Sequence, residues 1–185
     1  EALSEKVPIM PNSESRDTLF NSLLSPWFFY LWYPLEAPDD ELMPSDQSVA
    51  ARFINEEGDR LDGVTRRYIE AARREPFSFW QVLAVSPGES ILLKDMVTDA
   101  ERVVHDRCMT KTVPKWDIVF AQVVGLDGFY VFNALAPYPL PPSRFRHHVA
   151  SFIDKLKRIT GPHVKPLTLL SGQGEERFQL QSSFF

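Results

Sequence analysis

The fold is organised around residues 77–135, FSFWQVLAVSPGESILLKDMVTDAERVVHDRCMTKTVPKWDIVFAQVVGLDGFYVFNAL. Short apolar runs rich in aromatic and β-branched residues alternate there with turn-forming segments, a pattern typical of β-strands. Strands are expected at residues 77–85, 90–97, 101–108, 117–126 and 129–135. The stretch therefore predicts a small five-stranded antiparallel β-barrel or curved sheet, arranged as a meander, and it shows no recognisable active site.

Two turns and two strands within this stretch carry specific expectations. Pro87-Gly88 should reverse the chain after the first strand, because proline presets the first turn angle and glycine accepts a positive φ. Asp127-Gly128 is the dipeptide most typical of a type I′ hairpin. The run 117–126 is almost continuously apolar, as in a strand covered on both faces. The run 101–108 is weakly apolar, so we expect it at a sheet edge.

The core of the barrel should include two large aromatic side chains. Trp80 and Phe120 each lie in a strand with apolar residues on either side. We therefore expect both to be buried, and buried in one core.

Helices are expected on both sides of the barrel, so the fold class is α+β. Apolar periodicity and end signals predict them at residues 16–24, 25–34, 46–57, 63–74 and 143–159. Ser45 and Asp62 are the expected N-caps of the third and fourth helices. An extended arm is predicted at 1–15. One compact unit follows at 16–185, with a helical segment at 16–75, the β-meander at 76–141, and a C-terminal helix with a tail hairpin at 142–185.

The last helix has an apolar stripe with basic side chains off it. The stripe consists of Phe145, Val149, Phe152, Leu156 and Ile159. The basic side chains are Arg144, Arg146, Lys155, Lys157 and Arg158. The stripe should pack on the protein, which leaves the basic side chains outward as a candidate partner-binding face.

Composition narrows the classes of protein and site. The 185 residues suit one domain with a real hydrophobic core. Cys108 is the single cysteine, which excludes an internal disulfide and every cysteine-rich zinc site, so we expect no cofactor in this chain and zinc only in a segment outside it. No apolar stretch approaches the roughly 20 residues of a membrane span. We expect a cytoplasmic protein, and a fragment or processed chain because it begins with Glu1.

Charge is distributed unevenly along the chain. The formal net charge is −5, with −8 on residues 1–60 and +4 on residues 142–185. An acidic front and a basic tail can attract each other within one molecule. Alternatively, the basic tail forms a binding face for an acidic partner.

The most aromatic segment, residues 25–34, contains Trp27 and Trp32. The acidic residues that follow it argue against a membrane-surface anchor, which needs cationic flanks. Core packing is one interpretation of the segment. An exposed groove for a partner, lined by the two tryptophans, is the other.

Residues with catalytic or metal-binding chemistry are few. His105 and Cys108 have a metal-like spacing, but two ligands do not close a zinc site. His147 and His148 are helix neighbours that diverge, so they are poor joint ligands. A third group, Asp95, Asp99 and Glu101, surrounds one turn. These acids either cap backbone amides or form an acidic site that binds a cation or shares a proton.

Several segments resemble bacterial proteins that carry a SEC-C motif. The segments are Pro26-Trp27, Leu31-Trp32, Ala51–Ile54, Arg60-Leu61, Arg67–Ala72, Pro76–Leu83, Pro87-Gly88, Leu93–Thr98 and Trp116–Val124. The similarity covers about residues 20–160. In those proteins a helical segment leads into a β-rich domain of unassigned activity, attached to a short zinc module related to the tail of the SecA translocation motor. That module is absent here, and Cys108 does not match it, so no zinc ligand is implied for this chain.

Three functional hypotheses follow. The favoured one is a non-catalytic interaction or adaptor module of SEC-C type that binds a protein partner. The second is a nucleic-acid or ribosome-associated factor that uses the basic C-terminal helix, although phosphate binding usually shows a clear basic footprint. The third is an enzyme with an acidic site around the turn that holds Asp95 and Asp99.

Overall fold

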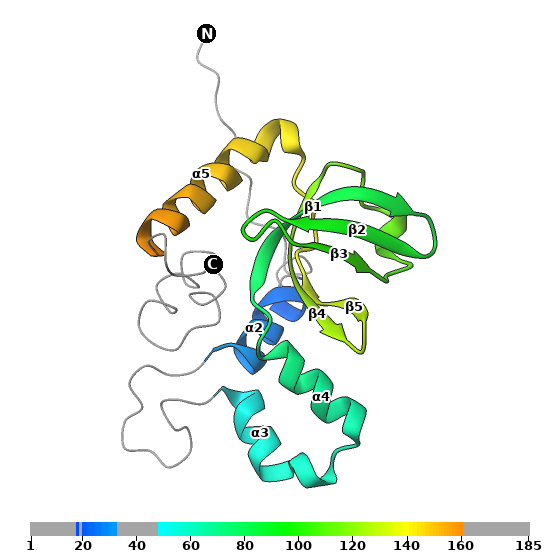
Figure 1. Cartoon of the computed structure of the whole chain (residues 1–185), viewed down its shortest axis with the longest axis vertical. Helices are drawn as coiled ribbons and strands as arrows, with labels where there is room; N and C mark the ends of the chain where they lie inside the picture. The colour runs from blue at the N-terminus through cyan, green and yellow to red at the C-terminus, as the bar shows by residue number, and fades with distance from the viewer. Residues whose placement is uncertain (1–17, 19, 33–47, 161–185) are drawn as a thin grey trace.

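The computed structural model describes residues 18, 20–32 and 48–160. The arm predicted at residues 1–15 and the hairpin predicted in the tail lie outside these ranges, as does Ser45. Figure 1 shows helices below and beside a β-barrel, with β2 and β3 facing the viewer and no helix in front of them. The α+β class and the small five-stranded barrel are confirmed.

All five predicted strands form, and they close a barrel in the order β1-β2-β3-β5-β4. Their bounds are β1 (Phe77–Ser86), β2 (Ser90–Asp95), β3 (Glu101–Val104), β4 (Ile118–Leu126) and β5 (Phe129–Leu135). Four pairings are antiparallel, but β3 meets β5 in a parallel bridge at Val104 and Tyr130. The barrel is therefore mixed and follows a Greek-key order, the general plan of the OB-fold, rather than a simple meander.

The expectation that the third strand lies at an edge is wrong, because β3 pairs with β2 on one side and with β5 on the other. Its low apolar content has another cause. The guanidinium of Arg102 lies 5.3 Å from the Trp80 ring and 5.0 Å from the Tyr130 ring, where it donates to the carbonyl of Val123 at 3.0 Å. It also pairs with Glu75 at 3.0 Å. A paired and ring-stacked arginine thus fills space that an apolar side chain would normally occupy.

Two separate cores replace the single core expected for Trp80 and Phe120. Both side chains are buried, at 2% and 8% exposure. Trp80 lies inside the barrel with Val82, Leu93 and Val123. Phe120 points the other way along β4 and packs with Leu31 and other residues outside the barrel. Strand alternation explains the difference, since β4 is covered on both faces.

Helical elements lie outside the barrel, and some of them pack on the outer face of β4. They are η1 (Phe20–Leu24, a π-helical turn), α2 (Ser25–Tyr30), α3 (Val49–Glu57), η2 (Gly58–Arg60), α4 (Gly63–Ala72) and α5 (Pro142–Thr160). The predicted N-cap Asp62 is confirmed, since its side chain accepts from the amides of Val64 and Thr65. The third predicted helix begins later than expected, with Ser48 as its cap.

The last helix packs on the barrel through part of the predicted stripe. Val149 and Ile153 are buried against Val97 and Ile118, and the Phe152 ring lies edge-on to Phe79 at 6.1 Å. Ile153, which the predicted stripe omitted, therefore carries much of the contact. The side chains of Leu156 and Ile159 lie outside the part of the chain that the structure describes.

A polar network joins α4 to the barrel. Gln122, fully buried on β4, donates to the carbonyls of Ala72 and Glu75 at 2.7 and 2.6 Å. Its own carbonyl accepts from Asn133, whose carbonyl oxygen in turn accepts from the Tyr68 hydroxyl at 2.8 Å. Every group in this chain of contacts has a partner, as buried polar groups require.

Candidate functional site

The outer face of β2 and β3 consists of three rows of paired side chains. Ile91 and Leu93 point into the barrel, so Ser90, Leu92 and Lys94 point outward. The register pairs Lys94 with Glu101 and Leu92 with Val103. The next outward position is Ser90 on β2, and on the other strand it is His105, directly after β3. The face thus has a charged row, an apolar row and a polar row.

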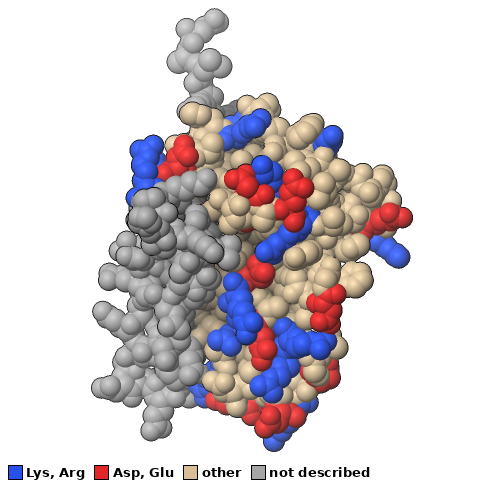
Figure 2. Space-filling model, viewed as in Figure 1, with Lys and Arg blue, Asp and Glu red and all other residues tan. Residues whose placement is uncertain are grey.

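This face is open to solvent. Val103 is 45% exposed, and Glu101 and His105 are exposed beside it. Figure 2, in the same view as Figure 1, shows charged side chains gathered around the β2–β3 hairpin and a largely uncharged area next to them. Single exposed apolar side chains are normal on a protein surface. Val103 differs in that it pairs with outward Leu92 between a charged row and a polar row, an apolar centre with a polar rim on a small scale.

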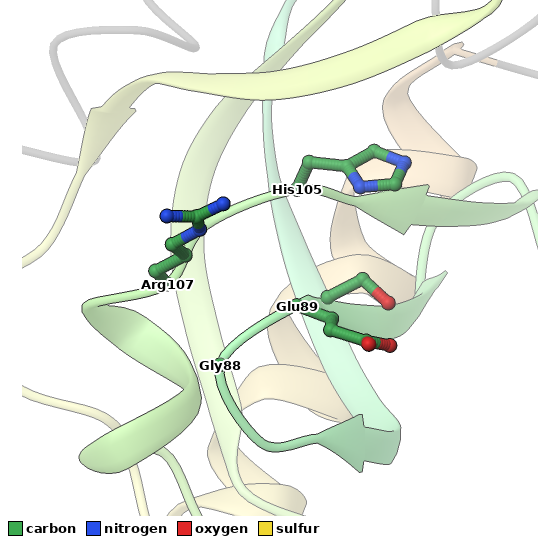
Figure 3. A pocket seen from close by; sticks show the side chains of 5 residues that line it. Gly88, Glu89, His105 and Arg107 are labelled. Carbon is green, nitrogen blue, oxygen red and sulfur yellow. The ribbon is translucent and has the colours of Figure 1, made fainter.

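A hollow of about 440 Å³ lies at one end of the face. It is lined by Gly88, Glu89, Ser90, His105 and Arg107. Figure 3 shows the His105 ring and the Glu89 side chain extending to the same side of the hollow, with Arg107 beyond the end of β3. The Phe129 ring, 64% exposed at the β4–β5 turn, lies 5.6 Å from the His105 ring. The volume falls in the range of small-ligand and side-chain pockets, roughly 300–1,000 Å³.

Hydrogen bonds hold the walls of the hollow in place. The Gly88 amide donates to the Thr110 hydroxyl at 2.9 Å, and that hydroxyl donates to the carbonyl of Arg107 at 2.8 Å. Asp106 accepts from the amides of Cys108 and Met109, which sets the turn into η3 (Met109–Lys111). The β1–β2 turn and the segment that carries Arg107 are therefore tied to each other.

The acidic residues around the β2–β3 turn have structural partners. Asp95 is buried and accepts from the Ser78 hydroxyl at 2.6 Å and from the Val97 amide at 2.8 Å. Asp99 pairs with Lys94 at 2.8 Å, and this hydrogen bond raises the pKa of the lysine. Glu101 points to solvent. The amide-capping interpretation therefore fits Asp95, whereas Asp99 forms an ion pair and Glu101 is exposed.

Neither of the two pairs discussed as metal ligands, His105 with Cys108 and His147 with His148, forms a site in the structure. The His105 ring contacts Phe129, whereas Cys108 is exposed after β3. The rings of His147 and His148 lie 6.3 Å apart on the exposed side of α5. Over residues 18, 20–32 and 48–160, no group of three or more His, Cys, Asp or Glu side chains could hold a metal ion.

The predicted partner-binding residues lie on two elements. Arg144, Arg146, Lys155 and Arg158 are exposed on α5, as the stripe predicts, and the side chain of Lys157 is not described. Trp27 is half-buried on α2, packed against the cluster that contains Phe120. Trp32 stacks on Phe28 at 5.0 Å. The structure therefore gathers the cations on one helix and places the tryptophans elsewhere.

Sequence reasoning missed the β2–β3 face and the hollow. Alternation along the second strand could have placed Leu92 outward, because Ile91 and Leu93 flank it. The hollow brings Glu89 of the β1–β2 turn to Arg107 after β3, and Phe129 contacts His105 beside it; no local pattern encodes this arrangement.

The fold and these surfaces define a small barrel protein with an open sheet face and a hollow at one end of it. None of the helices in the described ranges is both long and apolar enough to cross a membrane. The chain matches no known family model, no curated protein and no solved structure. Function must therefore be argued from the geometry.

Proposed function

We propose that the chain is a non-catalytic protein-binding module that holds its partner on the outer face of β2 and β3. The observation that carries the proposal is the outward apolar row of half-buried Leu92 and exposed Val103, bounded by a charged row and a polar row. Protein interfaces have this anatomy, with an apolar centre inside a polar rim. In five-stranded Greek-key barrels of the OB type this face and its adjoining loops bind oligonucleotides and oligosaccharides, so the analogy of fold supports the position of the site and not the class of its partner.

The charged row at the Lys94 end of the face favours a protein over a nucleic acid at that end. Lys94 pairs with Asp99, and Glu101 lies beside them, so this end of the face carries no excess of cations. A phosphate backbone requires such an excess. The resemblance to SEC-C motif proteins supports an adaptor role, and we place the module in the cytoplasm as part of the same proposal.

The test compares two valine-to-glutamate changes at exposed positions. The parent protein, Val103→Glu and Val64→Glu are used to capture partners from nuclease-treated extract of the source cells. Val64 is 56% exposed on α4 and serves as the matched control. Binding of each purified captured protein is then measured directly. We expect a partner that binds the parent and Val64→Glu but is at least tenfold weaker with Val103→Glu. Equal binding to all three would refute the proposed face.

A further inference from the structure

The hollow at the end of the face contains charged side chains that the fold does not use. Within the part of the chain that the structure describes, the side chains of Glu89 and Arg107 make no ion pair or hydrogen bond. Arg52 and Arg67 are paired with acids, whereas Arg144 on α5 is exposed and, like Arg107, has no acidic partner in the described residues, so what distinguishes Arg107 is its place at a hollow. Free charges around a concave site are the groups that orient a ligand.

These charges are presented by a rigid frame. The Gly88–Thr110 hydrogen bond and the Asp106 cap fix the segments on both sides of Arg107. A frame that is already ordered loses little conformational entropy when a ligand binds.

The local charge at this end of the barrel is positive. Between His105 and Trp116 the basic side chains are Arg107, Lys111 and Lys115, and Asp106 is the one acid. Lys111 belongs to η3, which the Gly88–Thr110 bond places against the β1–β2 turn. With Glu89, which lines the hollow, the balance at this end is three basic against two acidic side chains, a small positive excess that favours an acidic group. Complementary charge is the usual means of selecting a partner segment.

The chemistry of the hollow selects one acidic group beside an apolar one. A guanidinium binds a carboxylate through two parallel hydrogen bonds. Glu89 repels a second acidic group placed on its side of the hollow. The His105 ring lines the hollow, and the exposed Phe129 ring contacts it at 5.6 Å beside the hollow, where it offers a surface for an apolar or aromatic side chain.

We propose that the hollow binds an acidic peptide segment of the protein partner, with an aspartate or glutamate of that segment on Arg107 and its apolar neighbour against Phe129. The inference rests on the proposed function, since it names the chemistry of the segment that reaches the same face.

The experiment uses a displayed library of random peptides selected on the intact chain. Selected peptides are synthesised, and their affinities are measured for the parent, Arg107→Glu, Arg144→Glu and Val103→Glu. Arg144 is an exposed arginine on α5 and gives the matched charge reversal away from the hollow. We expect selected peptides enriched in Asp and Glu, with binding at least tenfold weaker for Arg107→Glu and unchanged for Arg144→Glu. Replacing the acid of a peptide by its amide should cause a similar loss.

The outcomes separate the two proposals. Peptides that depend on Val103 but not on Arg107 would overturn the acidic-segment inference and leave the binding face standing. Selection of no peptide that depends on Val103 or on Arg107 would count against both. Oligothymidylate that binds the parent, displaces the peptides and is lost with Arg107→Glu would show that the hollow takes a nucleic acid, which also overturns the inference.

Discussion

Single residues fix the turns through backbone angles that few residues adopt. Asp127 and Gly128 both have positive φ, at 51° and 87°, as the predicted type I′ turn requires. A Cβ on Gly128 would meet no heavy atom within 4 Å, so the restriction comes from the backbone and not from space. Gly88, with φ of 78°, plays the corresponding part in the β1–β2 turn.

Gly128→Val should lower the free energy of unfolding by about 1–2 kcal/mol, because a β-branched residue strongly disfavours positive φ. The control is Gly63→Ala, since Gly63 begins α4 and a Cβ there meets nothing within 4 Å. Urea denaturation followed by circular dichroism measures both variants. A Gly128→Val midpoint equal to that of the parent would reject the turn.

Residue-level prediction succeeded where a short motif determines its own geometry. Asp127-Gly128, Pro87-Gly88 and the Asp62 cap are of this kind. It failed for Arg102, whose partners come from three distant segments. A charged side chain within a strand suggests an exposed edge unless those partners are known.

At the scale of elements, α4 is attached to the barrel by the network around Gln122. Strand bounds were predictable because alternation and turn dipeptides are local signals. This attachment was not, because the Gln122 amide meets carbonyls about 50 positions earlier in the chain. Gln122 itself sits in a run that otherwise reads as purely apolar.

Gln122→Met should lower the free energy of unfolding by about 2–4 kcal/mol. The change keeps the volume but leaves the Ala72 and Glu75 carbonyls without their donor, and each unsatisfied buried group costs roughly 1–3 kcal/mol. Gln81→Met, at a half-buried position on β1, is the matched control and should cost less than about 1 kcal/mol. Equal losses in the two variants would mean that the network does not stabilise the fold.

Tyr68, on α4, should make the stability of the protein depend on pH in the alkaline range. Burial, and then the nearby charge of Tyr30, raise the pKa of Tyr68 above its ordinary value of 10.0. The unfolded chain therefore loses this proton at lower pH than the folded protein, so stability falls as the pH rises past about 10. Tyr68→Phe should fall less steeply in urea midpoints measured from about pH 8 to pH 11. Tyr138→Phe, at an exposed position, should follow the parent, and a Tyr68→Phe slope as steep as the parent's would contradict the assignment.

For the whole molecule, the arrangement of strands and charges was the least predictable feature. A meander was expected because consecutive strands usually pair, but β3 and β5 are joined by a non-local parallel bridge. That closure decides which face stays open, and hence where the candidate site lies. Charge shows the same dependence on the fold. The chain totals −5, whereas the described ranges carry 16 basic and 14 acidic side chains, a net +2.

Because the described residues carry a small net positive charge, nucleic-acid binding through α5 needs a direct test. At most about four phosphate contacts are available on α5, from Arg144, Arg146, Lys155 and Arg158. Each contact adds about −0.9 to the slope of the logarithm of affinity against the logarithm of salt concentration. So few contacts give little binding at about 0.15 M salt, especially with −8 on residues 1–60. We therefore expect no measurable binding of single-stranded or duplex probes by fluorescence anisotropy under those conditions.

The double change Arg144→Glu with Lys155→Glu reverses the α5 face, and Arg107→Glu with Lys111→Glu is a control with the same charge change on the barrel. Neither should unfold the protein, because exposed charges contribute about 0–1 kcal/mol each. Anisotropy titrations across salt should be flat for the parent and both variants. Micromolar binding by the parent that disappears only in the α5 variant would refute the proposed protein partner and identify a nucleic acid as the ligand instead. Because that result would map to α5 and not to the β2–β3 face, it would also locate the new site.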